Sequence, residues 1–429
     1  MTPISTPIRH DAKVARKGSR IRRTAKVVAS LAAGLVLVAA LAFVALSVVF
    51  SPSYMFRWAV WQDADVGDHA RFPDRPMSAS SAAFAFDEPA DEQAAADEVR
   101  SAMERSTLVG DDADAFLEST GTQAFIVIRD DVILYEDYFN TFERDSIATS
   151  FSVAKSYLSA LVGIAIAEGA IGSTDDPITD YVPELLERDE RFGRITIGHL
   201  LDMTSGLRYE ESGLPWGDDA LTYYFDDLRA LAIQRSQIEE PPGERWHYVN
   251  YNPLLLGVAL ERATGASVTD YLEDRIWSRI GTEFDASWSL DHEDGFEKLE
   301  SGINARAIDF AKLGRLYLND GAWEGEQVVP AAWVEASTGR EDGGASAAYP
   351  DRFVQDYGTI SHERYWWRIA RPDGGSAFSA VGNHGQFVFV SPAERLIIVR
   401  TGERYGVTSF ECLELFTTIA DTVGRPTAP

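Results

Sequence analysis

The hydrophobic and polar positions of this chain follow the period of β-strands near the two ends of its main body and the period of α-helices between them. Residues 124–128 and 132–138 are rich in β-branched and aromatic side chains, and the polar turn 129–131 joins them as a hairpin. Strand-like runs return late in the sequence, at residues 365–370, 377–381, 385–390 and 395–400. A helix is expected over residues 410–423, and residues 152–339 are expected to be mostly helical.

This order of elements predicts an α+β fold. Strands contributed by both ends of the body can pair in one antiparallel sheet that helices cover, while the long helical stretch between them forms a second, all-α lobe. We expect the functional site in a cleft between the two parts.

An uncharged, apolar stretch at residues 27–50 is long enough to cross a bilayer, and we expect a transmembrane anchor there. The basic side chains precede it, so residues 1–26 are expected to be a cytoplasmic tail. Tyr54, Trp58 and Trp61 follow the stretch like an interfacial aromatic belt. The body would then lie on the periplasmic or extracellular side of the inner, cytoplasmic membrane. The alternative is a signal peptide that is cleaved near its end.

Composition changes the picture mainly through charge. The 429 residues carry a net charge of −28 although residues 1–26 are basic, so the remainder is more acidic still. Such a body repels nucleic acid, and we expect no nucleic-acid partner. Residues 51–115 are interpreted as an acidic lead-in, and residues 116–425 as the main domain.

Candidate metal ligands are sparse. Cys412 is the only cysteine, which excludes an intramolecular disulfide and a cysteine-rich metal site. Asp63, Asp65 and Asp68 precede a lone His69, a spacing that is not typical of a metal site. No phosphate-cradling glycine loop or dinucleotide fingerprint occurs. We therefore expect neither a metal nor a cofactor.

The clearest candidate chemistry is the Ser152-x-x-Lys155 pattern at the start of an apolar helix that Gly169 ends. Residues three apart lie on one face of a helix, so the hydroxyl and the amine would be adjacent. Helix N-terminal amides favour negative charge near the serine oxygen, and burial favours a neutral lysine that can accept a proton. Alternatively, Ser152 caps the helix and Lys155 is a solvated charge. Chance occurrence is limited because only Lys298 and Lys312 join Lys155 after residue 26.

Three downstream segments accompany this pattern: residues 195–207, the Tyr248-Val249-Asn250 run within residues 246–257, and residues 381–386. With Ser152-x-x-Lys155 they resemble the serine β-lactamase and penicillin-recognising superfamily, in its class C-like branch, over roughly residues 120–425. The chain is most similar to the 6-aminohexanoate-dimer hydrolases and the family VIII esterases. Additional matching features are Ser156, residues 202–206, residues 304–306 and residues 309–321.

The resemblance implies a β-lactamase/transpeptidase-like fold and roles for four side chains. Ser152 would be the nucleophile, and Lys155 the proton acceptor beside it. Tyr248 would be the phenol or phenolate that relays protons to the leaving group. Asn250 would hold the Lys155 side chain or the substrate amide.

The resemblance also implies an oxyanion hole, formed by the backbone amide of Ser152 and an amide near Gly385 and Gln386. His384 is expected to line the site; its alternative interpretation is a strand-end histidine that is bonded to backbone. The stretch 209–225, with Trp216 and Tyr223, is either an aromatic lid over the substrate or a packed loop.

One departure from the family pattern bears on the substrate. The Lys-Thr-Gly or Lys-Ser-Gly of classical β-lactamases is missing, and residues 383–385 stand in its place. Loss of that cation removes a partner for a substrate carboxylate. We therefore predict a serine hydrolase that cleaves a small-molecule ester or amide through an acyl-enzyme. The alternatives are a β-lactamase or D-alanyl-D-alanine carboxypeptidase, and a catalytically silent binding protein on the same fold.

Overall fold

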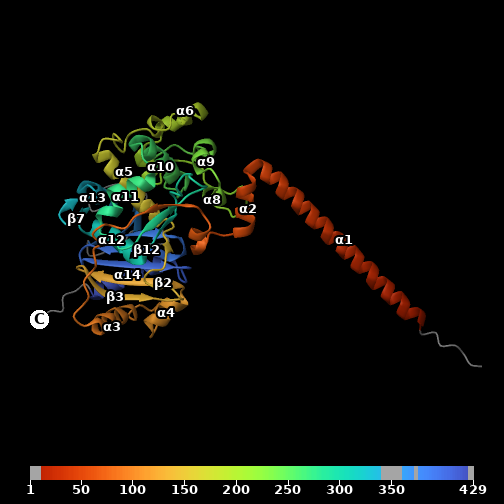
Figure 1. Ribbon diagram of the computed structural model, residues 1–429, viewed down its shortest axis with the longest axis horizontal. Helices are drawn as coiled ribbons and strands as arrows, with labels where there is room; N and C mark the ends of the chain where they lie inside the picture. The colour runs from red at the N-terminus through yellow and green to blue at the C-terminus, as the bar shows by residue number, and fades with distance from the viewer. Residues whose placement is uncertain (1–10, 340–359, 372–374, 424–429) are drawn as a thin grey trace, which may run out of the picture. The chain divides into compact units, whose positions relative to one another are not determined.

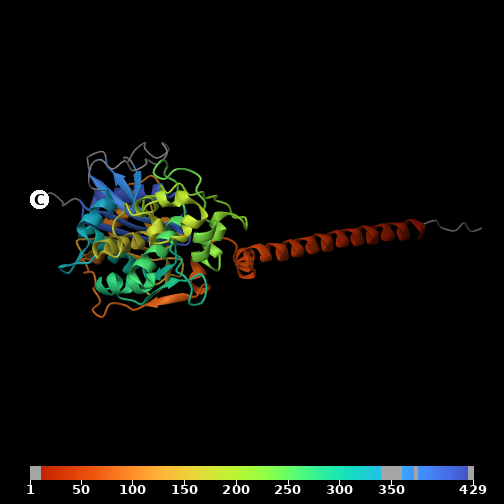
Figure 2. The same ribbon diagram turned by 90° about the horizontal axis from the view of Figure 1, so that it is seen from above.

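The computed structural model describes residues 11–339, 360–371 and 375–423, and its contacts divide the chain into two compact units, Met1–Gln62 and Asp63–Pro429. The first unit holds two helices, α1 (Asp11–Phe50) and α2 (Pro52–Trp61), and α1 is one long continuous helix (Figures 1 and 2). Its apolar part, Thr24–Phe50, has the length and composition of a membrane anchor, features that a signal sequence near an N-terminus shares.

The second unit is built on a seven-stranded antiparallel sheet with the strand order β3-β2-β13-β12-β11-β10-β9. These strands are β2 (Thr122–Arg129), β3 (Val132–Tyr138), β9 (Ile360–Glu363), β10 (Trp366–Ala370), β11 (Ser376–Gly382), β12 (Gln386–Ser391) and β13 (Leu396–Gly402). Asp130 and Asp131 turn the β2–β3 hairpin with φ of 50° and 64°, which two-residue turns of this kind require. The pairing of β13 with β2 joins the early and late segments, as predicted.

Alternation along the central strands explains why the sheet is covered on both faces. Phe387 and Phe389 of β12 belong to a core with α3 (Glu92–Met103), α4 (Ala113–Ser119) and α14 (Ser409–Val423). Val388, between these two phenylalanines, packs instead beside Gly314 of α12 (Ala307–Leu318) on the other face. In Figure 1, α3 and α4 lie below the sheet, and α12 lies above it.

Helix α5 (Val153–Ala167) runs from the nucleophile candidate into this second layer, and every residue from Val153 to Ala165 is buried. A helix with apolar side chains on nearly every side is typical of such an interior position. The helices that follow it make up most of the lobe above the sheet in Figure 1. They are α6 (Glu184–Arg188), α7 (Ile197–Leu201), α8 (Asp218–Tyr224), α9 (Leu228–Arg235), α10 (Tyr251–Thr264), α11 (Val268–Arg275) and α13 (Ala331–Thr338).

Short strands interrupt the stretch that the sequence pattern indicates as mostly helical. Two of them, β5 (Ala286–Ser289) and β6 (Ile303–Ala305), join the earlier strands β1 (Asp74–Met77) and β4 (Ala148–Thr149) in a small sheet with the order β1-β5-β6-β4. The pair β7 (Ala322–Trp323) and β8 (Glu326–Gln327) forms a separate ribbon. Strands of two to four residues are too short for a two-residue period to be recognised. Because β1 pairs with β5, part of the expected lead-in is built into the body.

Candidate active site

The loop that carries Ser152 is held on the small sheet by its backbone. Ala148 of β4 pairs with Ala305 of β6, and the Ser150 amide donates to the Ile303 carbonyl at 2.7 Å. Phe151, directly before the nucleophile candidate, has φ of 43°, a left-handed conformation that costs a non-glycine residue free energy. Strain of this kind persists only where the surroundings hold it, and here it positions Ser152 at the start of α5.

Lys155 lies against the Ser152 hydroxyl, as its spacing predicts. Its Nζ is 2.9 Å from Ser152 Oγ and donates to the Glu300 carbonyl oxygen at 2.6 Å. The side chain is buried, and burial lowers the pKa of Lys155 to about 7, although the nearby Glu300 carboxylate opposes this shift. A substantial fraction of the amine is therefore unprotonated at neutral pH, and it faces the proton that a nucleophilic serine must lose.

Tyr248 approaches the pair from the loop before α10. Tyr248 lines the same pocket as Ser152, and the centre of its ring lies 5.1 Å from Lys155 Nζ. Burial raises the pKa of Tyr248. The nearby Ser152 hydroxyl opposes the rise only in part, and the acidic groups Glu300, Glu211 and Asp219 add to it. Tyr248 is therefore a protonated phenol at neutral pH, which suits a proton donor better than a base.

Among the described residues, the Lys155 amine bonds to Ser152 and Glu300 and not to Asn250. Asn250 precedes α10, and its Nδ2 donates to the Tyr209 hydroxyl at 2.9 Å, while Tyr209 donates to Asp219 Oδ1 at 2.7 Å. Asn250 Oδ1 is buried and has no hydrogen-bond partner among the described residues. The expected bond from Asn250 to Lys155 is thus replaced by a bond from the Asn250 amide nitrogen to the Tyr209 hydroxyl. The Asn250 amide oxygen remains without a described partner beside the pocket.

The strand that approaches Ser152 does so through Gly382, at the end of β11, and not through Gly385 and Gln386. A methyl group added at Gly382 would lie 3.1 Å from the Ser152 amide nitrogen and would overlap the Ser150 carbonyl oxygen. Asn383 follows and lines the pocket. The main chain then turns away through the short helical turn η6 (Asn383–Gly385), in which His384 has φ of 60°.

This turn directs Gly385 and Gln386 into the sheet. The Gly385 carbonyl accepts from the buried Arg400 guanidinium at 2.8 Å, and Gln386 Nε2 donates to the Gly402 carbonyl at 2.6 Å. Neither residue lines the pocket. An oxyanion amide from this strand would therefore come from Asn383, three residues before Gln386.

His384 is bonded to backbone, in line with the alternative interpretation, and is absent from the pocket lining. Its Nδ1 lies 2.9 Å from the Glu403 carbonyl oxygen, and its Nε2 lies 2.9 Å from the Ala64 carbonyl oxygen. Its ring contacts Phe151 with centroids 4.8 Å apart. His384 thus fixes the turn and the nucleophile loop against the segment that begins the second unit.

The two aromatic side chains proposed as a lid do not line the pocket. Trp216 is exposed to solvent, and Tyr223 packs under the nucleophile loop, where its hydroxyl donates to Asp68 Oδ2 at 2.9 Å. The 209–225 stretch contributes Tyr209, Glu211 and Asp219 to the pocket instead. The packed-loop alternative fits Tyr223, whereas Trp216 is neither packed nor part of the pocket lining.

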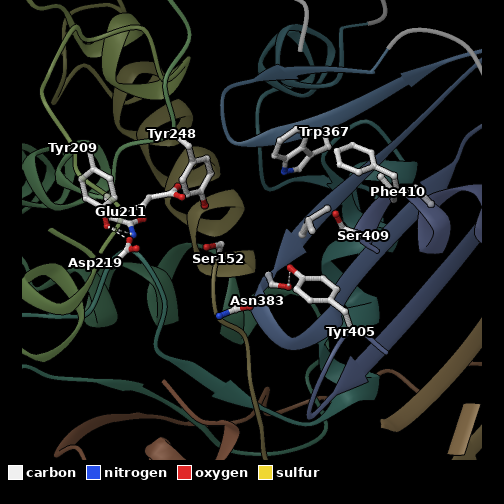
Figure 3. Close-up of a pocket in the computed structure, with 14 residues that line it drawn as sticks. Ser152, Tyr209, Glu211, Asp219, Tyr248, Trp367, Asn383, Tyr405, Ser409 and Phe410 are labelled. Carbon is white, nitrogen blue, oxygen red and sulfur yellow. Dashed lines mark hydrogen bonds between the residues drawn. The ribbon is translucent and has the colours of Figure 1, made fainter. Parts of the chain in front are cut away.

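Ser152 opens into a pocket of about 460 Å³ that has two chemically different sides. Figure 3 shows Ser152 and Tyr248 between them. The polar side consists of Tyr209, Glu211, Asp219 and Asn250, and the apolar side of Trp367, Val381, Phe410 and Leu413. Among the described lining residues there is no lysine or arginine. The described residues also contain no group of three potential ligands placed to hold a metal ion.

The sequence pattern did not indicate several contributors to this site. Glu300 contributes its main-chain carbonyl, a group that every residue has and that no sequence pattern marks. His362 lies in a strand whose sequence shows no catalytic motif. His362 is buried with its ring 6.3 Å from that of Tyr248, and burial together with the Lys155 charge lowers the pKa of His362 to about 3. The imidazole is therefore uncharged at neutral pH and packs beside the Tyr248 ring. The glycine directly before Asn383 was the available signal for the close strand approach.

Comparison with known proteins agrees with this geometry. A family model described as Beta-lactamase matches residues 113–408. The 6-aminohexanoate-dimer hydrolase of Paenarthrobacter ureafaciens is 30% identical over 308 residues, which cover 67% of this chain and 74% of that protein. Penicillin-binding protein 4 of Amycolatopsis lactamdurans is 32% identical over a shorter stretch, which covers 32% of this chain and 35% of that protein.

Solved structures share the fold at lower identity. A Bacillus anthracis protein with the provisional name of 6-aminohexanoate-dimer hydrolase gives a TM-score of 0.70 at 24% identity, over 82% of this chain and 90% of that one. EstCE1, a hydrolase with promiscuous acyltransferase activity, gives 0.55 at 15% identity, over 78% of this chain and 99% of that one. The solved structures confirm the predicted fold class, and the family model confirms the predicted superfamily.

Proposed function

The chain belongs to the beta-lactamase family, and from this premise we propose that it is a serine hydrolase that cleaves a small-molecule ester or amide through an acyl-enzyme on Ser152. The observation that carries the proposal is the 2.9 Å contact between a buried, readily neutral Lys155 amine and the Ser152 hydroxyl. A nucleophilic serine needs such an adjacent base.

In the acylation step, Ser152 Oγ attacks the substrate carbonyl and gives its proton to Lys155 Nζ. Tyr248 donates its phenolic proton to the departing oxygen or nitrogen, which leaves an ammonium and a phenolate in the site. The backbone amides of Ser152 and Asn383 are the groups that would stabilise the negative charge on the carbonyl oxygen. Gly382 supports this role because it lets the two backbone segments approach closely.

The deacylation step reverses both proton transfers. Water attacks the acyl carbonyl and gives a proton to the Tyr248 phenolate, and the Lys155 ammonium returns its proton to Ser152 Oγ as the ester bond breaks. The product is the free acid, and all three side chains regain their starting protonation states.

The pocket lining favours substrates that have an apolar part and a neutral or cationic polar part. Glu211 and Asp219 lie on one side, and Trp367 and Phe410 lie on the other (Figure 3). Burial raises the pKa of Asp219, and a cation beside its carboxyl group would favour the charged form. A β-lactam or peptide carboxylate would find no cationic partner among the described lining residues, which disfavours the lactamase and carboxypeptidase alternatives.

A matched pair of substrates tests this specificity: the p-nitroanilides of hexanoic acid and 6-aminohexanoic acid, which differ in one terminal ammonium. We expect the wild type to have the higher kcat/KM for the ammonium compound. In the Glu211→Gln/Asp219→Asn variant, the ratio of the two kcat/KM values should fall about tenfold, which corresponds to about 1.4 kcal/mol. Linear aminohexanoate oligomers and nitrocefin complete the panel. Faster turnover of nitrocefin than of either anilide would contradict the proposed substrate class.

Rapid acid quench followed by peptide mass spectrometry tests the covalent step. During turnover of p-nitrophenyl butyrate we expect a butyryl group on the peptide that contains Ser152. Acylation of a different residue would exclude this serine as the nucleophile.

We also propose a location for the enzyme. The apolar Thr24–Phe50 helix would anchor the chain in the inner membrane by a single span, with the basic N-terminal residues inside and the second unit on the periplasmic or extracellular side. The substrate would then be met outside the cytoplasm.

A further inference from the structure

Two buried charges, Lys298 and Glu300, lie beside the proposed catalytic pair and are not used by the proposed reaction. Their side chains are 1% and 2% exposed, and Lys298 Nζ is 2.9 Å from Glu300 Oε1. The ammonium also lies 3.9 Å from the ring centre of Tyr223 and 4.5 Å from that of Phe72. Removing two charges from water is costly, and apolar residues of similar volume often serve stability as well. Stability alone therefore does not explain why Lys298 and Glu300 are buried at this position, which points to a functional role.

The turn that carries the pair is fixed by its surroundings. The Trp288 indole donates to the carbonyl oxygens of Lys298 and Ser301, at 3.0 Å each. The Lys298 amide donates to the Ser289 carbonyl of β5 at 2.9 Å. These bonds direct the Glu300 carbonyl to Lys155 Nζ at 2.6 Å. Ser152 Oγ lies 3.4 Å from the same carbonyl oxygen, so one main-chain group faces both Ser152 and Lys155.

The Glu300 carboxylate is only partly compensated. Oε1 accepts from Lys298 and from the Ser301 hydroxyl at 3.0 Å, but the buried Oε2 has no hydrogen-bond partner among the described residues. A half-satisfied buried carboxylate costs free energy, and its field is weakly screened. The groups that face Lys155 are this carboxylate, the Tyr248 phenol and the neutral His362, so Glu300 is the anionic group of the set.

We propose that Glu300, paired with Lys298, is a positioning residue: its main-chain carbonyl holds the Lys155 amine on Ser152, and its carboxylate sets the charge environment of that amine. This inference rests on the proposed function. The electrostatics agree with the geometry, because the Glu300 carboxylate opposes the burial that lowers the pKa of Lys155. Glu300 thus keeps the amine from losing its proton too readily, so that it can hold the proton it takes from Ser152 until deacylation.

The test is the pH dependence of the rate at which a fluorophosphonate probe labels Ser152 in the full chain. This reaction needs the activated serine but not the natural substrate. In Glu300→Gln, the amide can still accept from Lys298 and Ser301 while the negative charge is gone. We expect the rise of the labelling rate with pH to move to lower pH by about one unit, a typical effect of a close charge. The Lys298→Met/Glu300→Gln variant removes both charges and should move the rise in the same direction.

Ser301→Ala is the matched control, since it removes a hydrogen bond to Glu300 Oε1 and leaves every charge in place. We expect its labelling profile to keep the wild-type position. A purely structural role for the pair would lower the thermal midpoint of the Glu300→Gln variant without moving the profile, and that result would overturn the inference. If Glu300→Gln does not fold, an unmoved profile in the double variant has the same consequence. Absence of Ser152 labelling in the wild type would instead remove the proposed function itself.

Discussion

At the residue scale, burial acts in opposite directions on the two proton-transfer groups. It disfavours the charged form of each, so the pKa of Lys155 falls to about 7 and the pKa of Tyr248 rises. An amine and a phenol with similar ordinary pKa values thus become a base and an acid at neutral pH. The Ser152 hydroxyl accepts a hydrogen bond from the amine and shares its pocket with the phenol.

This division predicts the pH profile of hydrolysis. Only the unprotonated Lys155 amine accepts the serine proton, so kcat/KM should rise as the pH passes through about 7, where the amine loses its own proton. The raised pKa of Tyr248 keeps the phenol protonated above neutral pH, so no fall should follow directly on the alkaline side. A rate profile of p-nitrophenyl butyrate hydrolysis measures both features, and a rate that declines between pH 7 and 9 would be inconsistent with Tyr248 as the acid.

Tyr248→Phe removes the proton donor but keeps the ring beside Lys155. We expect kcat to fall by roughly 10²–10⁴-fold, the usual contribution of a general acid, with little change in the thermal midpoint. Tyr157→Phe is the matched control, because the Tyr157 hydroxyl is buried and has no hydrogen-bond partner among the described residues. Equal activities in the two variants would show that the Tyr248 hydroxyl has no role in the reaction.

At the element scale, the site depends on the close approach of two secondary-structure ends: the start of helix α5 and the end of strand β11. The left-handed Phe151 and the small sheet fix the first, and the η6 turn with its left-handed His384 fixes the second. They meet at Gly382, where no side chain fits. The close approach, and not any one side chain, would create the oxyanion hole.

Gly382→Ala tests this arrangement. The added methyl group would force the strand away from the Ser152 amide and would separate the two donors. We expect kcat to fall by roughly 10²–10³-fold, as for the loss of one oxyanion donor, with a smaller effect on KM. Gly193→Ala is the control, since its methyl group would meet only the Leu186 side chain at an ordinary 3.4 Å. Wild-type kinetics in Gly382→Ala would place the oxyanion donors elsewhere.

At the scale of the whole molecule, the structure shows which parts of the site a sequence can predict. Ser152 and Lys155 are three residues apart on one helix, so their contact is local and followed from spacing. Tyr248 comes from a distant segment, and its place rested on resemblance to a family. The register around Gly385 and Gln386 was missed because it depends on one left-handed residue, His384. The sheet followed from its long alternating strands, whereas the small sheet pairs segments too short to leave a pattern.

The two compact units predict how truncations behave. Residues 63–429 include every site residue and both layers around the main sheet, so this fragment should be soluble and should hydrolyse p-nitrophenyl butyrate. The full chain should sediment with membranes. Recovery of the full chain in the soluble fraction, with a new N-terminus near residue 50, would instead identify residues 27–50 as a signal peptide.

A second truncation, to residues 116–429, should not fold, although it keeps the catalytic side chains. It removes β1, which pairs with β5, and α3, whose Val99 and Met103 are fully buried in the core. Each such apolar side chain contributes about 1.5–3 kcal/mol by burial. The measurement is the soluble yield beside that of residues 63–429, and an equally soluble, active fragment would show that the lead-in is dispensable.

The most direct test of the central claim is p-nitrophenyl butyrate hydrolysis by Ser152→Ala in the 63–429 fragment. We expect turnover to fall to the background of the assay while the thermal midpoint stays near that of the wild type, because one half-buried hydroxyl is lost and the fold is kept. Turnover that persists at the wild-type rate would show that the reaction does not pass through this serine.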